Sequence, residues 1–287
     1  MSRIHTDSIF VERIVRPPKF KMKNDHMHAY FELYYLLDGT RKCFINHSFY
    51  TLNPHDMMLI RGGDLHHTSY LTENSHERIV VYFDEYVLNR LYDTYGRDTI
   101  LSCFQYPKCS IPEKDQSYLL ELLTSMSHQQ ELMDNYSVTI LQNRLEELLL
   151  YLLRLQKATL HDVEDPSEDS DITTAARYIC ENFQTELTLE AVAGRANMSP
   201  TYFSKKFKAM TGFGFKEYLN TIRLKEAARK LKDSNQPITE IALQCGFNDS
   251  NYFGDIFKKV YGISPRAFRK DGMTNSPWEK LCSTDHN

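Results

Sequence analysis

Histidine and glutamate side chains in the first part of the chain are spaced so that they could form one binding site. If the chain is extended there, alternate residues project to one face, and that face would carry His26, His28, Glu32, Tyr34 and Leu36. The segment 62–66 would bring His66 from a separate strand. Three imidazoles and a carboxylate suit a divalent transition metal. The same side chains could instead line a pocket without a metal, or hold loops by hydrogen bonds.

We favour the metal-free pocket, and we predict no bound cofactor. The predicted ligand-binding residues are His26, His28, Glu32, Tyr34 and His66. If a metal were bound instead, its candidate ligands would be His26, His28, Glu32 and His66, and the fourth residue would still have to be placed correctly.

Short strands are predicted around this site. Turn signals at Asp38-Gly39 and Gly62-Gly63-Asp64 separate segments rich in apolar and aromatic residues. These segments are residues 31–37, 42–45, 48–52, 57–61, 67–71 and 78–83. Such closely spaced strands predict a small antiparallel β-barrel or sandwich, whose interior would hold the site. Residues 1–20 are predicted to be a polar lead-in without a strand.

A second pattern, late in the chain, occurs twice. The segment 202–208 (YFSKKFK) returns 50 residues later as 252–258 (YFGDIFK). Ser199 and Asp249 precede the two copies where helices would be capped, and Gly212 and Gly262 follow them at the same distance. A repeat at fixed offset indicates a repeated supersecondary unit. We predict two helix-turn-helix units, an arrangement typical of proteins that read DNA.

Helices are predicted throughout this part, at residues 172–183, 188–196, from 200, 215–231, 238–245, 250–261 and from 265. The aromatic residues of the repeat are predicted to be its buried part. Helical spacing would turn one set of side chains towards the core: Phe203, Phe207 and Met210 in the first copy, and Phe253, Phe257 and Val260 in the second.

The outward faces of the repeated helices are predicted to contact DNA. Lys205 could pair with a guanine edge and Asn251 with adenine, whereas helix starts and other basic residues suit phosphates. The predicted DNA-binding residues are Ser199, Thr201, Ser204, Lys205, Lys208, Ser250, Asn251, Asp255, Lys258, Lys259 and Arg269. Residues 171–273 carry a net charge of +5 and the remainder −9, and a mildly basic part fits a polyanion partner.

The two copies differ on that outward face. Gly254 and Asp255 stand where the first copy has Ser204 and Lys205. A carboxylate could accept from a cytosine amino group, but it would also face the polyanion, and the glycine costs helix stability. We therefore expect the first unit to contribute more of the base readout.

The second unit carries a long signature. Ile238-x2-Ile241-Ala242-x3-Gly246-Phe247-x4-Tyr252-Phe253-x3-Phe257-Lys258-Lys259-x2-Gly262-x2-Pro265-x2-Phe268-Arg269 closely resembles that of the AraC/XylS family of bacterial transcription regulators. This resemblance implies a DNA-binding regulator with an N-terminal ligand-sensing half, and sugars or their derivatives as ligands.

The first half resembles the cupin barrel in two motifs, from His26 to Gly39 and over residues 55–66. In cupin enzymes the matching positions bind a metal, so the resemblance implies the four candidate metal ligands given above. Two departures stand in the second motif. His55 replaces its usual opening glycine, and Arg61 replaces its usual proline.

A leucine-rich stripe lies within residues 136–157, with apolar side chains at helical spacing: Leu141, Leu145, Leu148, Leu149, Leu152 and Leu155. It could belong to a helix that covers the barrel, or to a dimer contact through an antiparallel helix pair. We favour the dimer contact, because symmetric DNA readers are commonly dimers. The acidic segment 161–171 that follows is predicted to be a linker.

These predictions describe a multidomain α+β chain. An N-terminal antiparallel, cupin-like β-barrel with a helical dimerisation segment (1–160) precedes the linker (161–171), an all-α domain with two helix-turn-helix units (172–273) and a tail (274–287). The expected function is sequence-specific transcription regulation controlled by a sugar-like effector. The alternatives are a metal-dependent cupin enzyme with a helical appendage, and a ligand-independent regulator.

The expected setting of the protein follows from composition. The six cysteines are scattered without a CxxC pair, and no apolar run is long enough to span a bilayer, which favours a cytoplasmic protein without a membrane partner. The helix-turn-helix repeat argues against an enzyme, so we expect none. The expected partners are double-stranded promoter DNA, the small-molecule effector and a second copy in a homodimer, with RNA polymerase as a further candidate.

Overall fold

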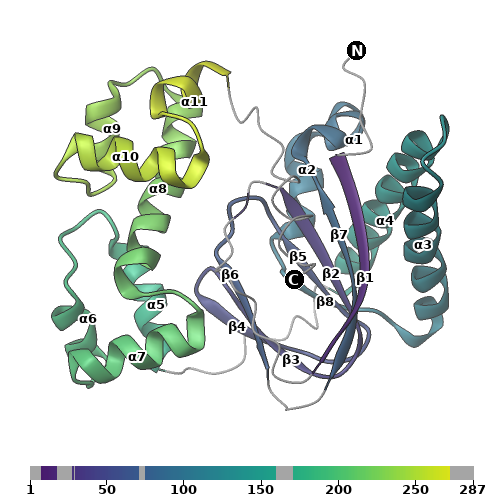
Figure 1. The fold of residues 1–287 in the computed structure, drawn as a ribbon, viewed down its shortest axis with the longest axis horizontal. Coiled ribbons are helices and arrows are strands. Elements are labelled where there is room, and N and C mark those ends of the chain that lie inside the picture. The colour runs from purple at the N-terminus through teal and green to yellow at the C-terminus, as the bar shows by residue number, and fades with distance from the viewer. Residues whose placement is uncertain (1–7, 18–27, 29, 71–74, 160–170, 272–287) are drawn as a thin grey trace. The chain divides into compact units, whose positions relative to one another are not determined.

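The structure is a computed structural model that describes residues 8–17, 28, 30–70, 75–159 and 171–271. The chain divides into two compact units, with the main boundary near residue 168 (Figure 1). The predictions for His26, for residues 161–170 of the linker and for the tail lie outside the described residues. None of the described helices is both long and apolar enough to cross a membrane.

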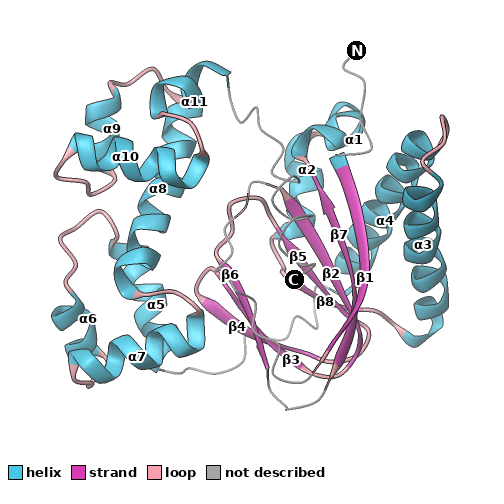
Figure 2. Cartoon of the chain, viewed as in Figure 1, coloured by secondary structure: helices cyan, strands magenta, loops and turns pink. Residues whose placement is uncertain are grey.

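The N-terminal unit contains two β-sheets, and every strand pairing given for them is antiparallel (Figure 2). The larger sheet has the order β1 (Ile9–Arg16), β7 (His76–Phe83), β2 (Phe31–Asp38), β5 (Asp56–Ile60) and β8 (Lys108–Ser110). The smaller has the order β4 (Ser48–Leu52), β3 (Arg41–Ile45) and β6 (His66–Tyr70). The six predicted strands are therefore confirmed, with ends that move by two residues or fewer.

The prediction of a polar lead-in over residues 1–20 is wrong, because β1 lies within it. β1 pairs with β7 along its whole length, from Ile9 opposite Phe83 to Arg16 opposite His76. Ile9 and Val11 are buried in the core, whereas Glu12 and Arg13 lie between apolar residues and hide the strand signal in the sequence. β8 was not predicted either; three residues are too few to show a period.

The larger sheet is buried on both faces, and alternate residues separate the two. On β2, Phe31, Leu33 and Tyr35 belong to one core cluster, and Tyr34 and Leu36 belong to another. The first cluster continues into the helices, and the second into side chains of the smaller sheet. The prediction that one parity of this strand faces the interior between the sheets is confirmed for the described residues.

Two long helices, α3 (Glu113–Leu132) and α4 (Ser137–Thr159), cover the first face. The leucine stripe belongs to that core: Leu141, Leu145, Leu148, Leu149 and Leu152 are buried within one chain, and Leu155 packs against them. The favoured interpretation of this stripe as a dimer contact is therefore wrong, because its side chains are already covered by the sheet.

Four short elements that were not predicted connect β7 to β8: η2 (Glu85–Leu88), α1 (Asn89–Tyr95), α2 (Arg97–Leu101) and η3 (Ser102–Phe104).

The C-terminal unit is all helical. Its elements are α5 (Asp171–Asn182), α6 (Leu189–Arg195), α7 (Pro200–Thr211), α8 (Phe215–Asp233), α9 (Ile238–Gln244), α10 (Ser250–Tyr261) and α11 (Pro265–Asp271). The predicted helices are confirmed, although Asp171, assigned to the linker, already belongs to α5. The long α8 joins the two helix-turn-helix units, α6–α7 and α9–α10 (Figure 1).

The repeated segments have the same local structure. The Ser199 hydroxyl accepts from the Tyr202 amide at 3.4 Å, and the Asp249 carboxylate accepts from the Asn251 amide at 2.8 Å. Gly212 and Gly262 end the two helices in the left-handed region, at φ 84° and 78°. Both predicted caps and both predicted stops are confirmed, so the repeat in sequence is a repeat in structure.

The predicted core positions hold in part. Phe203, Phe207, Phe253 and Phe257 are buried, Met210 is only half-buried, and Val260 is 38% exposed. The place expected for Val260 is taken by Tyr261, whose ring lies 4.5 Å from Phe257 and 5.2 Å from Phe268. The tyrosines of the repeat are not in the buried part: Tyr202 is 57% exposed and Tyr252 41%.

Gly246, in the turn after α9, has no room for a side chain. Its φ is +86°, and a Cβ would lie 2.8 Å from the Phe183 carbonyl oxygen and 2.9 Å from Arg223 Nε. That same Nε donates to the Phe183 carbonyl at 2.8 Å, so these atoms cannot move apart without breaking their hydrogen bond. By contrast, a Cβ on Gly254 in α10 would meet nothing within 4 Å.

We predict opposite effects of alanine at these two glycines. Gly246→Ala should lower the free energy of unfolding of the C-terminal unit by about 2–3 kcal/mol. Gly254→Ala should raise it by up to about 1 kcal/mol, because alanine favours a helix interior. Denaturant unfolding followed by far-UV circular dichroism measures both, and equal effects of the two substitutions would contradict this assignment.

Candidate functional site

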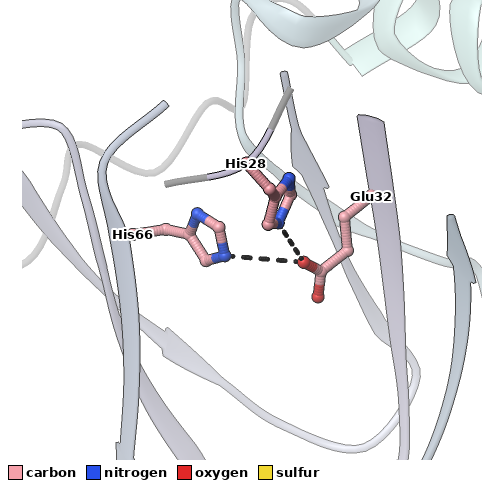
Figure 3. Close-up of side chains that lie close together, drawn as sticks. All are labelled: His28, Glu32 and His66. Atoms are coloured by element: carbon pink, nitrogen blue, oxygen red, sulfur yellow. Dashed lines mark hydrogen bonds and ion pairs between the residues drawn. The ribbon is translucent and has the colours of Figure 1, made fainter. Parts of the chain in front are cut away.

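Three of the five predicted ligand-binding side chains, those of His28, Glu32 and His66, meet between the two sheets, where Glu32 lies between the two imidazoles (Figure 3). Glu32 Oε2 is 3.1 Å from His28 Nε2 and 3.5 Å from His66 Nε2. Glu32 comes from β2 and His66 from the start of β6, so the prediction that a separate strand supplies the second imidazole is confirmed. Glu32 and His66 are buried, and His28 is half-buried.

The opposite nitrogen of each imidazole faces a backbone carbonyl. His66 Nδ1 is 3.0 Å from the Asp64 carbonyl oxygen, and His28 Nδ1 is 2.9 Å from that of Tyr30. A charged imidazole has two N–H groups and can donate to both of its neighbours, whereas a neutral one has a single N–H. The protonation states therefore decide which of these contacts are hydrogen bonds.

Glu32 affects the pKa values of the two histidines to different extents. Burial alone would lower the pKa of His66, but the hydrogen bond and charge of Glu32 more than offset this and raise it. Burial also lowers the pKa of His28, and here Glu32 offsets the shift only in part. Burial would raise the pKa of the Glu32 carboxyl, yet the hydrogen bonds from both imidazoles hold it well below its usual range.

The raised pKa of His66 favours an imidazolium that can donate to both Asp64 and Glu32, and the lowered pKa of His28 favours a neutral ring with one N–H for two acceptors. One of its two nitrogens therefore faces an oxygen without a proton between them. A hydroxyl placed beside His28 Nε2 and Glu32 could donate its proton there and resolve that contact. The site can accept a ligand rich in hydroxyl groups.

A divalent cation would also suit this donor set. His28, Glu32 and His66 offer ligand atoms that all lie within 4.8 Å of one another. In both imidazoles the nitrogen away from the cluster faces a carbonyl, the arrangement that orients histidine in metal sites. His26, the remaining candidate ligand, lies outside the described residues.

Aromatic rings surround the cluster. Tyr30 stacks on His28, with ring centroids 3.7 Å apart, and meets Tyr82 edge to face at 5.4 Å. Tyr34, a predicted ligand-binding residue, lies on the same face but farther along β2, beneath the guanidinium of Arg78 at 5.2 Å. Sequence reasoning missed Tyr30, Tyr82 and Arg78, although the alternation of β7 places 78, 80 and 82 on one face.

The departure at His55 has a structural counterpart. His55 adopts φ +70°, the left-handed conformation that a glycine would adopt without strain. Its Nδ1 lies 2.9 Å from the Tyr35 hydroxyl, a contact that glycine could not make. The chain therefore keeps the turn at this position with a different residue.

The predicted DNA-facing residues lie where the sequence placed them in most cases. Several are exposed on the repeated helices or at their starts: Ser199, Thr201, Lys205, Lys208, Ser250, Asn251, Asp255, Lys258 and Lys259. Ser204 is half-buried. Arg269 is tied to its own domain, because its guanidinium donates to the Gln236 carbonyl at 2.6 Å. Exposed Tyr202 and Tyr252 join the outward set that sequence reasoning had left out.

Two family profiles match the chain. One, described as a helix-turn-helix domain, matches residues 192–271, and one described as the ExsA N-terminal regulatory domain matches residues 32–163. A regulatory domain followed by paired helix-turn-helix units defines a sequence-specific DNA-binding transcription regulator. The chain belongs to the AraC/XylS family of these regulators, as its signature over 238–269 predicted.

Relatives agree with this class. Regulatory protein PocR of Salmonella typhimurium strain LT2 is 38% identical over 108 residues, 38% of this chain and 36% of PocR. The HTH-type transcriptional activator RhaS of Klebsiella pneumoniae strain 342 is 26% identical over 253 residues, 86% of this chain and 87% of RhaS.

Two solved structures are also similar. The C-terminal domain of the response regulator AraT from Geobacillus stearothermophilus matches 41% of this chain and 93% of that domain, at 36% identity and a TM-score of 0.35. Unsaturated fatty acid-bound ToxT from Vibrio cholerae strain SCE256 matches 93% of this chain and 97% of ToxT, at 18% identity and a TM-score of 0.39.

The His66–Glu32 pair predicts a pH-dependent stability. Because the pKa of His66 is raised, its contribution is full below its ordinary pKa of 6.5 and is lost as pH rises through the raised value. The lowered pKa of Glu32 means that its contribution is present above its ordinary value of 4.5. Glu32→Gln should therefore destabilise the N-terminal unit most between about pH 5 and 6.5, by about 2 kcal/mol, and less at about pH 9.

Thermal unfolding of both proteins across this pH range measures the difference. Glu77→Gln serves as the control, because Glu77 pairs with the partly exposed Arg13 at the surface. A destabilisation by Glu32→Gln that does not change with pH would contradict the assignment of an imidazolium to His66.

Proposed function

We propose that a small, hydroxyl-rich, sugar-like molecule binds between the two sheets and sets how strongly this regulator occupies its promoters. The observation that supports this is that both nitrogens of His28 face acceptors, while burial lowers its pKa and so favours a neutral ring with one proton. A ligand hydroxyl supplies the missing donor. The rings of Tyr30 and Tyr82 offer the flat apolar surface that sugar carbons pack against.

The ligand would act by differential affinity. A molecule that binds one conformation of the regulator better than another shifts the population towards it, and DNA affinity changes by the same coupling free energy. In this proposal the protein is a cytoplasmic homodimer that binds double-stranded promoter DNA and has RNA polymerase as a further partner. The leucine stripe of α4 is buried, so a second copy would meet another face of the domain.

DNA contact is proposed for the outward faces of α7 and α10. Short side chains near each helix start, Thr201 and Asn251, suit base edges, and the lysines that follow suit a guanine edge or phosphates. Asp255 occupies in α10 the place of Lys205 in α7, and both are exposed. We assign the larger share of sequence readout to α7.

We predict unequal losses from two matched lysine substitutions. Lys205→Ala should weaken binding to a specific site by about 1–3 kcal/mol and reduce discrimination against scrambled DNA. Lys258→Ala should weaken binding to both DNAs alike, because a phosphate contact carries no sequence information. Gel-shift titrations against a selected site and its scrambled version measure both, and equal loss of discrimination would contradict the proposed division.

The effector response should depend on His28. In wild type, a sugar that binds the N-terminal unit should change the affinity for DNA, and His28→Ala should abolish the change while leaving affinity without sugar intact. His128→Ala is the control, because His128 is exposed on α3. Fluorescence anisotropy with a sugar panel measures this, and a response that survives in His28→Ala would defeat the proposed site.

The rival function, a metal-dependent cupin enzyme, makes a different prediction for the same residues. It requires a stoichiometric transition metal in the purified protein that is lost in His28→Ala. Metal analysis, together with DNA binding after treatment with a chelator, separates the two. We expect DNA affinity and its sugar response to survive removal of metal.

A further inference from the structure

The face between the sheets has a second polar region, beyond Tyr34 on β2. Registers across the sheet pair Glu32 with Tyr82, Tyr34 with Val80, and Leu36 with Arg78. Glu32 and Tyr34 share this face, as do Val80 and Tyr82. Arg78 has the parity of Val80 and therefore projects to the same face, at the opposite end from the His28–Glu32–His66 cluster.

Arg78 is buried there without a paired carboxylate. It is 3% exposed, and among the described residues no carboxylate oxygen lies within ion-pair distance of its guanidinium. Its Nε has no hydrogen-bond partner of good geometry in the described part of the chain. Glu32 acts on it only through its charge and is already bonded to two imidazoles. A buried guanidinium in this state is costly unless something else meets it.

Tyr34 presents a second donor at the same place. It is 2% exposed, and apart from its interaction with the Arg78 guanidinium its hydroxyl has no hydrogen-bond partner among the described residues. The Arg78 guanidinium lies 5.2 Å from the centre of its ring. A buried hydroxyl beside a buried guanidinium suits an oxyanion, because both groups donate and a carboxylate or phosphate only accepts.

The charged side chains around Arg78 are positive as well. Arg41 on β3 is buried, donates to the Thr68 carbonyl at 3.5 Å and acts electrostatically on Tyr34. Burial and the positive charges of Arg41, Arg78 and Arg16 together lower the pKa of His76 to about 3. The region therefore has a positive potential, which favours an anion and disfavours a cation.

We propose that the effector of this regulator carries an anionic group, a carboxylate or a phosphate, which binds Arg78 and Tyr34 while its hydroxyls meet the His28–Glu32–His66 cluster. This inference rests on the proposed function and narrows its ligand from sugar-like molecules to sugar acids or sugar phosphates. Glu32 and Tyr34 are two residues apart, about 7 Å along a strand, and the Arg78 guanidinium reaches back to lie over the Tyr34 ring. A small polyol with a terminal anionic group can span that distance.

The test uses the full-length protein and three probes that differ in charge: glucose, gluconate and glucose 6-phosphate. Binding is measured by isothermal titration calorimetry and by the shift in melting temperature. At least one anionic probe should bind about tenfold or more tightly than glucose. The preferred anion then distinguishes a carboxylate site from a phosphate site.

Arg78→Met should remove the preference for the anionic probe, and Tyr34→Phe should reduce it. Arg78→Met should also raise or preserve the melting temperature of the ligand-free protein, because it removes a buried charge. Arg13→Met is the matched control, since Arg13 pairs with Glu77 at the surface, and it should leave the preference unchanged. A purely structural arginine would give the reverse: lower ligand-free stability with the preference intact.

Three results would overturn the inference. They are glucose binding as tightly as both anions, an anion preference that survives in Arg78→Met, and no binding of any anion, inorganic phosphate included, at millimolar concentration. A different result would contradict the proposed function alone. If gluconate or glucose 6-phosphate binds through Arg78 but leaves DNA affinity unchanged, the anion site stands and control of DNA binding does not.

Discussion

The N-terminal unit depends on one constraint, that its five-stranded sheet is buried on both faces. The two-residue period of a strand then divides every central strand into two sets of side chains. One set on β2, β5 and β7 is apolar and packs against α3 and α4. The other set faces the smaller sheet and can hold polar groups only where partners satisfy them. Glu32 meets that condition with two imidazoles, and Arg78 does not meet it with any described carboxylate.

The C-terminal unit uses one local structure twice. Both copies keep the buried phenylalanines, a polar N-cap and a glycine stop, so both helices have the same support. The two copies differ on their outward faces instead. Lys205 and Asp255 stand at equivalent places with opposite charge, so the outward faces of α7 and α10 differ in the charge that they present.

Local patterns in the sequence were enough for six of the eight described strands, for the helices of the C-terminal unit and for part of the site. Alternation located β2 and the inward parity of Glu32, and caps located both repeated helices. Tertiary context decided the rest. The leucine stripe of α4 shows a buried face whatever covers it, so the sequence could not distinguish the sheet from a second chain. β1 is masked by Glu12 and Arg13, and Val260 was displaced by Tyr261. Arg78 on an interior face contradicts the usual exposure of arginine, which is why sequence reasoning missed it.

The central claim is that a ligand between the sheets and DNA on α7 and α10 are coupled, and reciprocity tests this most directly. The affinity of the tightest-binding anionic sugar should be measured by calorimetry for the free protein and for the protein bound to an operator selected from random DNA. The affinity for the operator should be measured with and without that sugar. Coupling predicts that the sugar and the operator change each other's affinity by the same factor. Affinities that stay unchanged although both molecules bind together would contradict the claim.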